Sequence, residues 1–214
     1  MRRTLLIASL LLAHCSLLLA QTFTSSPIPD SVFQRMQGRS YPRDCSVPRS
    51  ELRYLRLSHV DAQGREHVGE MVCNKAIAQD LLDIFRELYR QRYPIERIRL
   101  IDDYEAVDEQ SMRHNNTSSF CFRRVSGTQK LSKHARGMAV DINTLYNPYV
   151  RKGRDGRRIV EPATATPYAD RSRSFPYKIV KGDLLHRLFL QHGFTWGGSW
   201  RTMKDWQHFE KCLF

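Results

Sequence analysis

The stretch that decides the fold is "SKHARGMAVDIN", residues 132–143. It places a histidine seven residues before an aspartate, with Gly137 between them and small or β-branched residues around the acid. Side chains alternate between the faces of a strand, so "MAVDI" sends Val140 to one face and Asp141 to the other. A carboxylate beside a buried strand requires a positive partner. The stretch therefore predicts a strand with a charged site on its open face.

The segment just upstream, "SSFCFR" at residues 118–123, alternates in the same way. Its two phenylalanines share one face, and Arg123 lies on the other. If the two strands are neighbours, Asp141 and Arg123 emerge on the same open side. His134 stands in the loop between them, where Gly137 allows a tight turn against the sheet.

A histidine and an aspartate so placed, with one further histidine, form the three-ligand pattern of a catalytic zinc site. His208 is the favoured third ligand, because Asp205 lies three residues before it and offers a carboxylate that can act as general base. Residues three apart on a flat strand face opposite sides, so the chain must bend between these two. The other candidates are His59, His67, His114, His186 and His192.

Two motifs in this order resemble a known family. "SKHARGMAVD" fits S-x-H-x-x-G-x-A-x-D in full, and "WGGSW" followed by "DWQHFE" fits its downstream partner. Together they closely resemble the zinc D-alanyl-D-alanine carboxypeptidases of bacterial cell walls, in the branch that includes L-alanyl-D-glutamate endopeptidases. The resemblance covers roughly residues 51–211.

This resemblance implies a role for each matched residue. His134, Asp141 and His208 correspond to the zinc ligands and Asp205 to the catalytic base. Arg123 corresponds to the arginine that stabilises the developing oxyanion.

The chain departs from the family pattern just before that arginine. Cys121 and Phe122 stand where a different pair is expected, so Arg124 is an alternative for the oxyanion role. Strand alternation favours Arg123.

Further residues are candidates for the surroundings of the zinc. Glu210 is interpreted as a partner that orients a histidine rather than as a ligand. Trp200 and Trp206 bracket the base and could contact substrate, although a core role is simpler. Ser132, which opens the first motif, is placed with them. His59 and His67 are interpreted as solvent-facing.

The order of elements predicts an α+β fold with a small antiparallel sheet and flanking helices. Residues 51–73 read as a hairpin, Asn74 as the cap of a helix that ends before Pro94, and residues 147–178 as a long basic loop. Asp183 and Gly193 should bound a second helix. The resemblance implies the zinc fold that these peptidases share with the hedgehog signalling domain.

Three parts are expected along the chain of 214 residues: a signal peptide at 1–20, an N-terminal extended arm at 21–50 and a zinc peptidase domain at 51–214. The first part predicts a secreted protein of the periplasm or cell envelope, without stable membrane insertion. The net charge of +12 is spread along the chain and no nucleic-acid motif occurs, which disfavours a nucleic-acid partner. A monomer that acts on peptidoglycan stem peptides is expected.

Four cysteines remain after the signal peptide, an even number that suggests disulfides in an oxidising compartment. Cys45 can reach Cys73 by a short return of the arm. Cys121 and Cys212 form a possible second pair, although Cys121 could be a free thiol near the zinc.

Two functions of different class remain. One is a zinc metallopeptidase that cuts stem peptides, of D-Ala-D-Ala carboxypeptidase or L-Ala-D-Glu endopeptidase type. The other is a catalytically inactive, zinc-stabilised cell-wall-binding module. Asp205 and Arg123 favour the enzyme, because a binding module needs neither.

Overall fold

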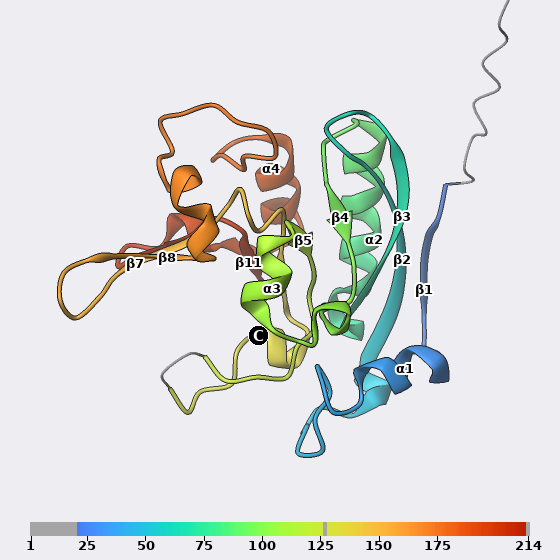
Figure 1. Cartoon of the computed structure of the whole chain (residues 1–214). Helices are drawn as coiled ribbons and strands as arrows, with labels where there is room; N and C mark the ends of the chain where they lie inside the picture. Colours follow the sequence, from blue (N-terminus) through green and yellow to red (C-terminus); the bar gives the residue numbers. More distant parts are fainter. Residues whose placement is uncertain (1–20, 126–127, 213–214) are drawn as a thin grey trace, which may run out of the picture.

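The computed structural model describes residues 21–125 and 128–212. The expected signal peptide lies outside the described residues. The fold is α+β, as predicted, with small, mainly antiparallel sheets and packed helices (Figure 1). Within the described part, no helix is both long and apolar enough to cross a membrane.

The predicted hairpin is the scaffold of the fold. β2 (Leu52–Val60) and β3 (Glu66–Asn74) pair antiparallel, and β1 (Phe23–Ser26) pairs with the outer edge of β2. Alternation gives the hairpin two apolar faces, each of which is covered by other elements. One face carries Leu55, Leu57, Met71 and Cys73, and the other carries Leu52 and Val72.

The helix α2 (Lys75–Arg90) covers the first of these faces (Figure 1). Asn74 caps it, as predicted: its side chain accepts a hydrogen bond from the Ala76 N–H at 3.0 Å. Apolar residues recur along one side of the helix and enter the main core. Residues of β6 (Ala139–Asp141), α4 (Leu184–Gln191) and β11 (His208–Glu210) join them there. Its buried positions are Ile77, Ala78, Leu81, Leu82, Ile84, Phe85 and Leu88.

The second face is covered by residues that were expected to form only an extended arm. That expectation was incomplete, because residues 21–50 contain β1 and a short helix, α1 (Asp30–Met36). Val32 and Met36 of α1 are buried against Leu52 and Val72, and Phe120 joins this smaller core. The helix could not be recognised from the sequence, because only two of its seven side chains are buried and they give no clear apolar periodicity.

The two-sided hairpin also separates the cysteines. Cys73 lies in the core under α2, whereas Cys45 packs against the smaller core on the other face. The expected bridge between them is therefore not formed. Cys121 is buried and Cys212 is exposed, and these two are free thiols as well.

His59 is buried, contrary to its interpretation as solvent-facing, with only 4% of its surface exposed. The cause is β4 (Arg97–Ile98), which crosses β3 at Gly69. A Cβ on Gly69 would lie 2.4 Å from the Ile98 Cβ and 3.2 Å from His59 Cε1, so the glycine permits the crossing. His67 stacks on His59 and stays partly exposed.

The strands that carry the motifs belong to two small sheets. β6 (Ala139–Asp141) pairs with β11 (His208–Glu210), which pairs in turn with β9 (Thr195–Trp196). β10 (Met203–Asp205) pairs instead with β7 (Tyr149–Lys152).

The region of residues 147–178, expected to be a loop, contains regular structure. β7 and β8 (Arg158–Glu161) form a hairpin there, followed by the 3-10 helix η4 (Ala163–Ala169). Four-residue strands between prolines and glycines give too little periodicity to predict from sequence.

The remaining elements are short, apart from α4, which Asp183 caps and Gly193 follows as predicted. They are η1 (Arg49–Glu51), η2 (Ile101–Tyr104), α3 (Asp108–Arg113), β5 (Asn116–Thr117), η3 (His134–Arg136), α4 (Leu184–Gln191) and η5 (Gly197–Ser199).

Gly137 fastens the first motif to this scaffold. It adopts a φ of 65°, in the left-handed region, and its carbonyl accepts the Asn74 N–H at 2.9 Å. A Cβ at this position would lie 2.6 Å from the Asn74 nitrogen. The glycine of the motif is thus required both by its turn and by its contact with the backbone that starts α2.

We expect Gly137→Ala to destabilise the protein more than Gly156→Ala. Gly156 has a φ of 78°, but a Cβ there would meet nothing within 4 Å, so its substitution should cost only the left-handed strain, roughly 1–2 kcal/mol. Gly137→Ala adds a collision with backbone and should cost at least about twice as much. Urea denaturation of both variants measures the difference; equal losses would show that the close contact with Asn74 relaxes freely.

A second prediction concerns Asp61, which organises the turn between β2 and β3. Its carboxylate accepts the N–H groups of Gln63 at 2.9 Å and Arg65 at 3.0 Å, and pairs with the side chains of Arg65 and His67. Burial would raise the pKa of Asp61, but these partners hold it well below its usual range. Asp61→Asn should therefore lower the free energy of unfolding by about 1–3 kcal/mol at pH 7.

Because the folded-state pKa of Asp61 is depressed, its contribution is fully present above the unfolded value of about 3.9 and is lost progressively as the pH falls from there through the lower folded-state pKa. Urea titrations at pH 7, 5 and 3 should therefore show the same difference between the wild type and Asp61→Asn at pH 7 and 5, and a smaller difference at pH 3. Asp155→Asn is the control, since Asp155 occupies the exposed β7–β8 turn and bonds the Arg157 N–H at 3.0 Å. A constant difference from pH 7 to pH 3 would exclude the charge of Asp61 as the cause.

Candidate metal centre

His134 is held by one side-chain and one backbone partner. Its N–H donates to the Ser132 hydroxyl at 3.1 Å, at the start of η3, and its ring Nδ1 lies 2.7 Å from the Ser119 carbonyl oxygen. A carbonyl oxygen only accepts, so Nδ1 carries the proton and Nε2 presents a lone pair. The ring is buried, with 5% of the residue exposed.

Strand pairing sets the other two groups opposite each other. In the register of β6 and β11, His208 faces Asp141, and His208 Nδ1 lies 2.9 Å from Asp141 Oδ1. The other carboxylate oxygen, Oδ2, lies 3.2 Å from His134 Nε2. Residues that are distant in sequence thus meet at one point on the open side of β6.

The donor atoms of this cluster match a divalent metal ion such as zinc. His208 Nε2 lies 3.1 Å from Glu210 Oε2, so this outer nitrogen donates and Nδ1 turns its lone pair inward. His134 Nε2 and His208 Nδ1 then face each other at 3.1 Å beside a carboxylate. The three ligand atoms lie within 4.8 Å of one another. Converging electron-rich atoms of this kind are satisfied together by one cation, and the residues present fit a zinc ion.

The electrostatics of the cluster also favour positive charge. Burial would raise the pKa of Asp141, but His134 and His208 outweigh burial and hold it well below its usual range. Burial would lower the pKa of His208, but hydrogen bonds to Asp141 and Glu210 raise it to about 10. The cluster attracts a proton for the same reason that it fits a metal.

Asp205 reaches this cluster through the bend that the spacing required. β10 ends at Asp205 and β11 begins at His208, and the two strands join different sheets. Gly197 permits the bend, because a Cβ there would lie 2.7 Å from the Asp205 carbonyl oxygen. Asp205 Oδ1 is buried and has no hydrogen-bond partner among the described residues. Burial raises the pKa of Asp205 to about 7.

The two candidate arginines have different surroundings. Arg123 Nε lies 2.6 Å from Asp108 Oδ2, and Arg123 interacts electrostatically with both Asp141 and Asp205. Arg124 is exposed and donates to the carbonyl of Gln129 within its own loop. The strand expected around them is reduced to bridges, Ser118 with Asp141 and Arg124 with Leu131.

The structure places the other predicted residues unequally. Ser132 and Glu210 contact the histidines, as described above, and the Trp200 ring packs 5.4 Å from that of His208. Trp206 lies elsewhere: it packs against the main core, and the guanidinium of Arg171 stacks on its ring at 4.9 Å. Trp206 is therefore not brought to the cluster.

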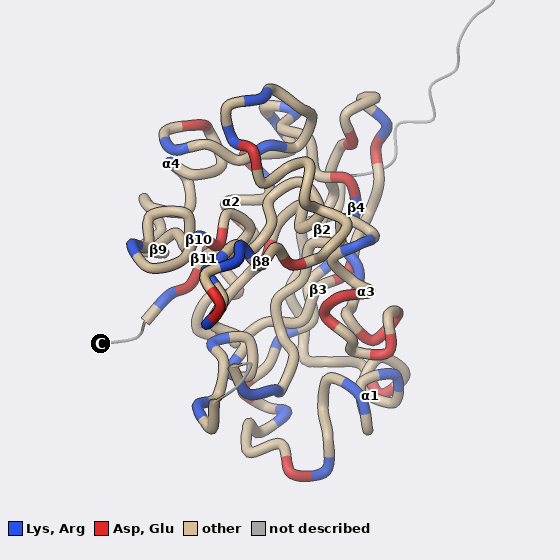
Figure 2. Tube along the Cα trace, turned by 60° about the vertical axis from the view of Figure 1, so that its left-hand side comes forward, with Lys and Arg blue, Asp and Glu red and all other residues tan. Residues whose placement is uncertain are grey.

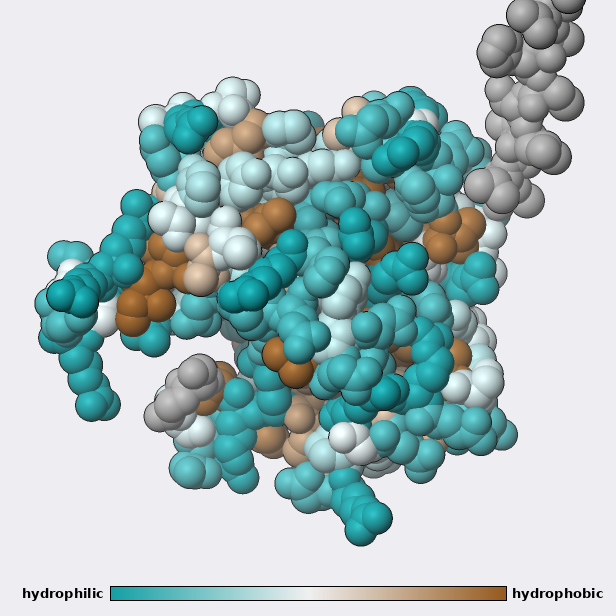
Figure 3. Space-filling view, in the orientation of Figure 1, coloured by the Kyte–Doolittle hydropathy of each residue, from teal (hydrophilic) through white to brown (hydrophobic). Residues whose placement is uncertain are grey.

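A groove adjoins Arg123. It has a volume of about 410 Å³ and is lined by the site segment and by the arm, through Pro42, Asp44, Ser46, Phe122, Arg123, Arg124 and Leu131. On the face in Figure 3, the surface is also indented between the β7–β8 hairpin and the loop that leads to η3. Arg123 thus borders space large enough for part of a substrate.

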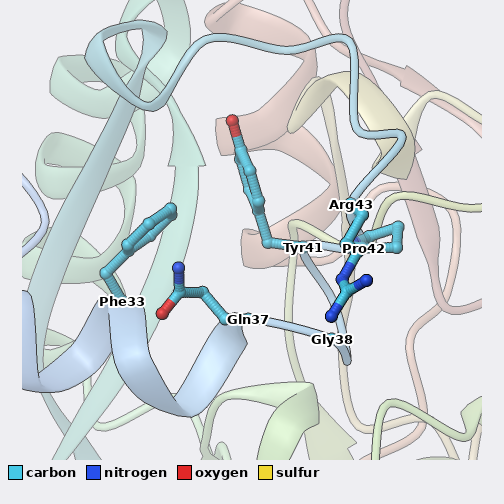
Figure 4. Close-up of a pocket in the computed structure, with 6 residues that line it drawn as sticks. All are labelled: Phe33, Gln37, Gly38, Tyr41, Pro42 and Arg43. Atoms are coloured by element: carbon cyan, nitrogen blue, oxygen red, sulfur yellow. The ribbon is translucent and has the colours of Figure 1, made fainter.

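A larger hollow of about 520 Å³ lies on the arm, between α1 and the segment that follows it. Figure 4 shows its lining side chains, among them Phe33 and Tyr41, whose rings pack edge to face with centroids 5.0 Å apart. None of the predicted site residues lines it.

Positive charge does not gather at one element. Lys and Arg are distributed over loops, hairpins and helices along the whole trace in Figure 2. Many pair with acids, such as Arg35 of α1 with Glu70 of β3, and Arg86 with Asp83 on the preceding turn of α2.

Three contributors to the site were not predicted. The Ser119 carbonyl that orients His134 is a backbone group, to which residue type gives no clue. Asp108 lies 15 positions before Arg123 with no motif to connect them. The contact of Gly137 with Asn74 joins two parts of the chain that are far apart in sequence.

One family model matches the segment that contains this site. Residues 126–211 match the family model described as D-alanyl-D-alanine carboxypeptidase. No match was found among curated proteins or among solved structures. The matched segment contains the whole cluster, Asp205 and both sequence motifs, whereas Arg123 lies before it. Over this segment, which is less than half of the chain, the sequence is similar to the D-alanyl-D-alanine carboxypeptidase family.

Proposed function

We propose that the chain is a secreted zinc metallopeptidase that hydrolyses peptide bonds in peptidoglycan stem peptides. The observation that carries this proposal is the convergence of His134 Nε2, His208 Nδ1 and the Asp141 carboxylate, with Asp205 and Arg123 beside them. The family match supports the reaction class. Near the N-terminus, Arg2 and Arg3 precede a long apolar run, and this pattern supports export to the periplasm or cell envelope.

His134, Asp141 and His208 would hold a zinc ion, which would supply Lewis-acid chemistry for the scissile carbonyl and for water. Asp205 accepts the proton that the attacking water loses and passes it to the leaving amine. Its pKa of about 7 suits both steps near neutral pH. Arg123 donates to the carbonyl oxygen as negative charge develops there.

The alternative is a binding module that has kept the ligands without turnover. Such a module gains nothing from a buried carboxylate with an unpartnered oxygen, because that group costs free energy. Arg123 would likewise need no placement within electrostatic reach of Asp141 and Asp205. These two residues favour the enzyme.

The bond that is cut distinguishes two subtypes. A carboxypeptidase must hold the free terminal carboxylate of D-Ala-D-Ala with a cation, and loop arginines could supply it. Arg171 does not suit this role, since its guanidinium donates to Tyr146 O, Asn147 Oδ1 and Ile179 O. Arg151 lies on the β7–β8 hairpin and pairs only loosely with Glu161, at 4.0 Å.

Digestion of purified peptidoglycan tests the function directly. Mass spectrometry of the released products should show free D-alanine for a carboxypeptidase, or fragments that begin at D-glutamate for an L-Ala-D-Glu endopeptidase. Zinc-loaded protein that releases neither, at any pH between about 5 and 9, would favour the binding module.

The purified protein should contain about one zinc ion per chain. His134→Ala should remove most of it, because the two remaining donors cannot complete the three-ligand set. His186→Ala is the matched control: His186 is also buried, but it contacts Trp196 and the Gly182 N–H away from the cluster. Metal analysis of the three proteins decides, and zinc retained in His134→Ala would remove that residue from the ligand set.

Asp205→Asn should abolish turnover while zinc stays bound. The variant keeps the shape of the side chain but cannot accept the proton, a loss of roughly 10²–10⁴ in rate. Peptide release and zinc content are measured on the same preparation. If the variant loses its zinc as well, Asp205 contributes to metal binding and its assignment as base fails.

A further inference from the structure

Asp108 is an acid for which the proposed chemistry has not yet given a role. It opens the short helix α3, and its Oδ2 lies 2.6 Å from Arg123 Nε. Both side chains are about one-third exposed, and Arg123 lines the groove described above. The contact is an ion pair at Nε, the inner nitrogen of the guanidinium, which is itself buried and makes no hydrogen bond to a described residue.

Arg123 has three acids around it. Burial would lower the pKa of Arg123, but Asp108, then Cys121 and Asp141, raise it. Asp205 also interacts with Arg123. Asp141 and Asp205 are the groups that a mobile guanidinium would approach, and pairing with either would occupy a proposed metal ligand or the proposed base.

We propose that Asp108 is a positioning residue, which holds Arg123 by Nε so that its terminal amino groups face the substrate carbonyl instead of pairing with Asp141 or Asp205. This inference rests on the proposed peptidase function. The planar guanidinium makes such a division possible, since Nε and the terminal nitrogens can bind different partners at once. A lysine at position 123 has no inner donor and cannot be held in this way.

The test is Asp108→Asn, which keeps the size of the side chain and removes its charge. We expect kcat on a stem peptide to fall by roughly 10–100-fold with little change in KM, because a displaced donor loses contact mainly with the transition state. Zinc content should match that of the wild type. Glu109→Gln is the matched control on the same helix, where Glu109 pairs with the surface residue Arg113. It should leave kcat unchanged.

A double-mutant cycle separates positioning from a general structural effect. In the Arg123→Lys background, Asp108→Asn should cause no further loss of kcat, because its effect acts through the guanidinium. Thermal unfolding of Asp108→Asn and Glu109→Gln should give similar midpoints.

The outcomes distinguish this inference from the function on which it rests. An active wild type whose Asp108→Asn variant behaves like Glu109→Gln, or is faster, overturns the positioning role alone. Additive losses in the double variant overturn it too. A zinc-loaded wild type without hydrolysis overturns the proposed function and this inference with it.

Discussion

The antiparallel register of β6 and β11 is the constraint on which the rest of the site depends. It sets Asp141 opposite His208, and a slip of one residue would send both side chains to the core face. The apolar neighbours prevent that slip: Val140 and Phe209 are fully buried in the main core. Burial of Val140 and Phe209 thus fixes the position of Asp141 and His208, whose side chains lie on the opposite face of the two strands.

Much of this arrangement could be predicted, because the two motifs record local constraints. The alternation of apolar and polar side chains around Asp141 predicted the face on which this carboxylate lies, and the spacing of Asp205 and His208 predicted a bend between them. In the structure, β10 ends at Asp205 and β11, which belongs to a different sheet, begins at His208. The hairpin and α2 were also predictable, since each has a long periodic pattern and α2 has a clear cap.

The features that were not predicted depend on contacts that produce no periodic pattern of apolar residues in the sequence. The arm contributes β1 and α1, whose burial rests on a few residues such as Val32 and Met36. β7 and β8 are held by pairing with each other and with β10 rather than by an apolar face. The cysteine pairing failed because an even count and a short separation say nothing about which face of a hairpin each residue occupies. The role of Asp108 could not be predicted, because two residues that form an ion pair between separate segments have no fixed spacing in the sequence.

The two-faced hairpin has a consequence for how the molecule opens. Strands β2 and β3 contribute side chains to both apolar cores, so that neither core can be exposed to solvent without disrupting strands that also form the other core. Amide hydrogens on β2 and β3 should therefore exchange only through global unfolding, whereas those of the β7–β8 hairpin, which lies outside both cores, should exchange through small local openings. The rigid part of the protein is then the β2–β3 hairpin, on which the core beneath the candidate metal cluster is built, and the part that opens more easily is the β7–β8 hairpin.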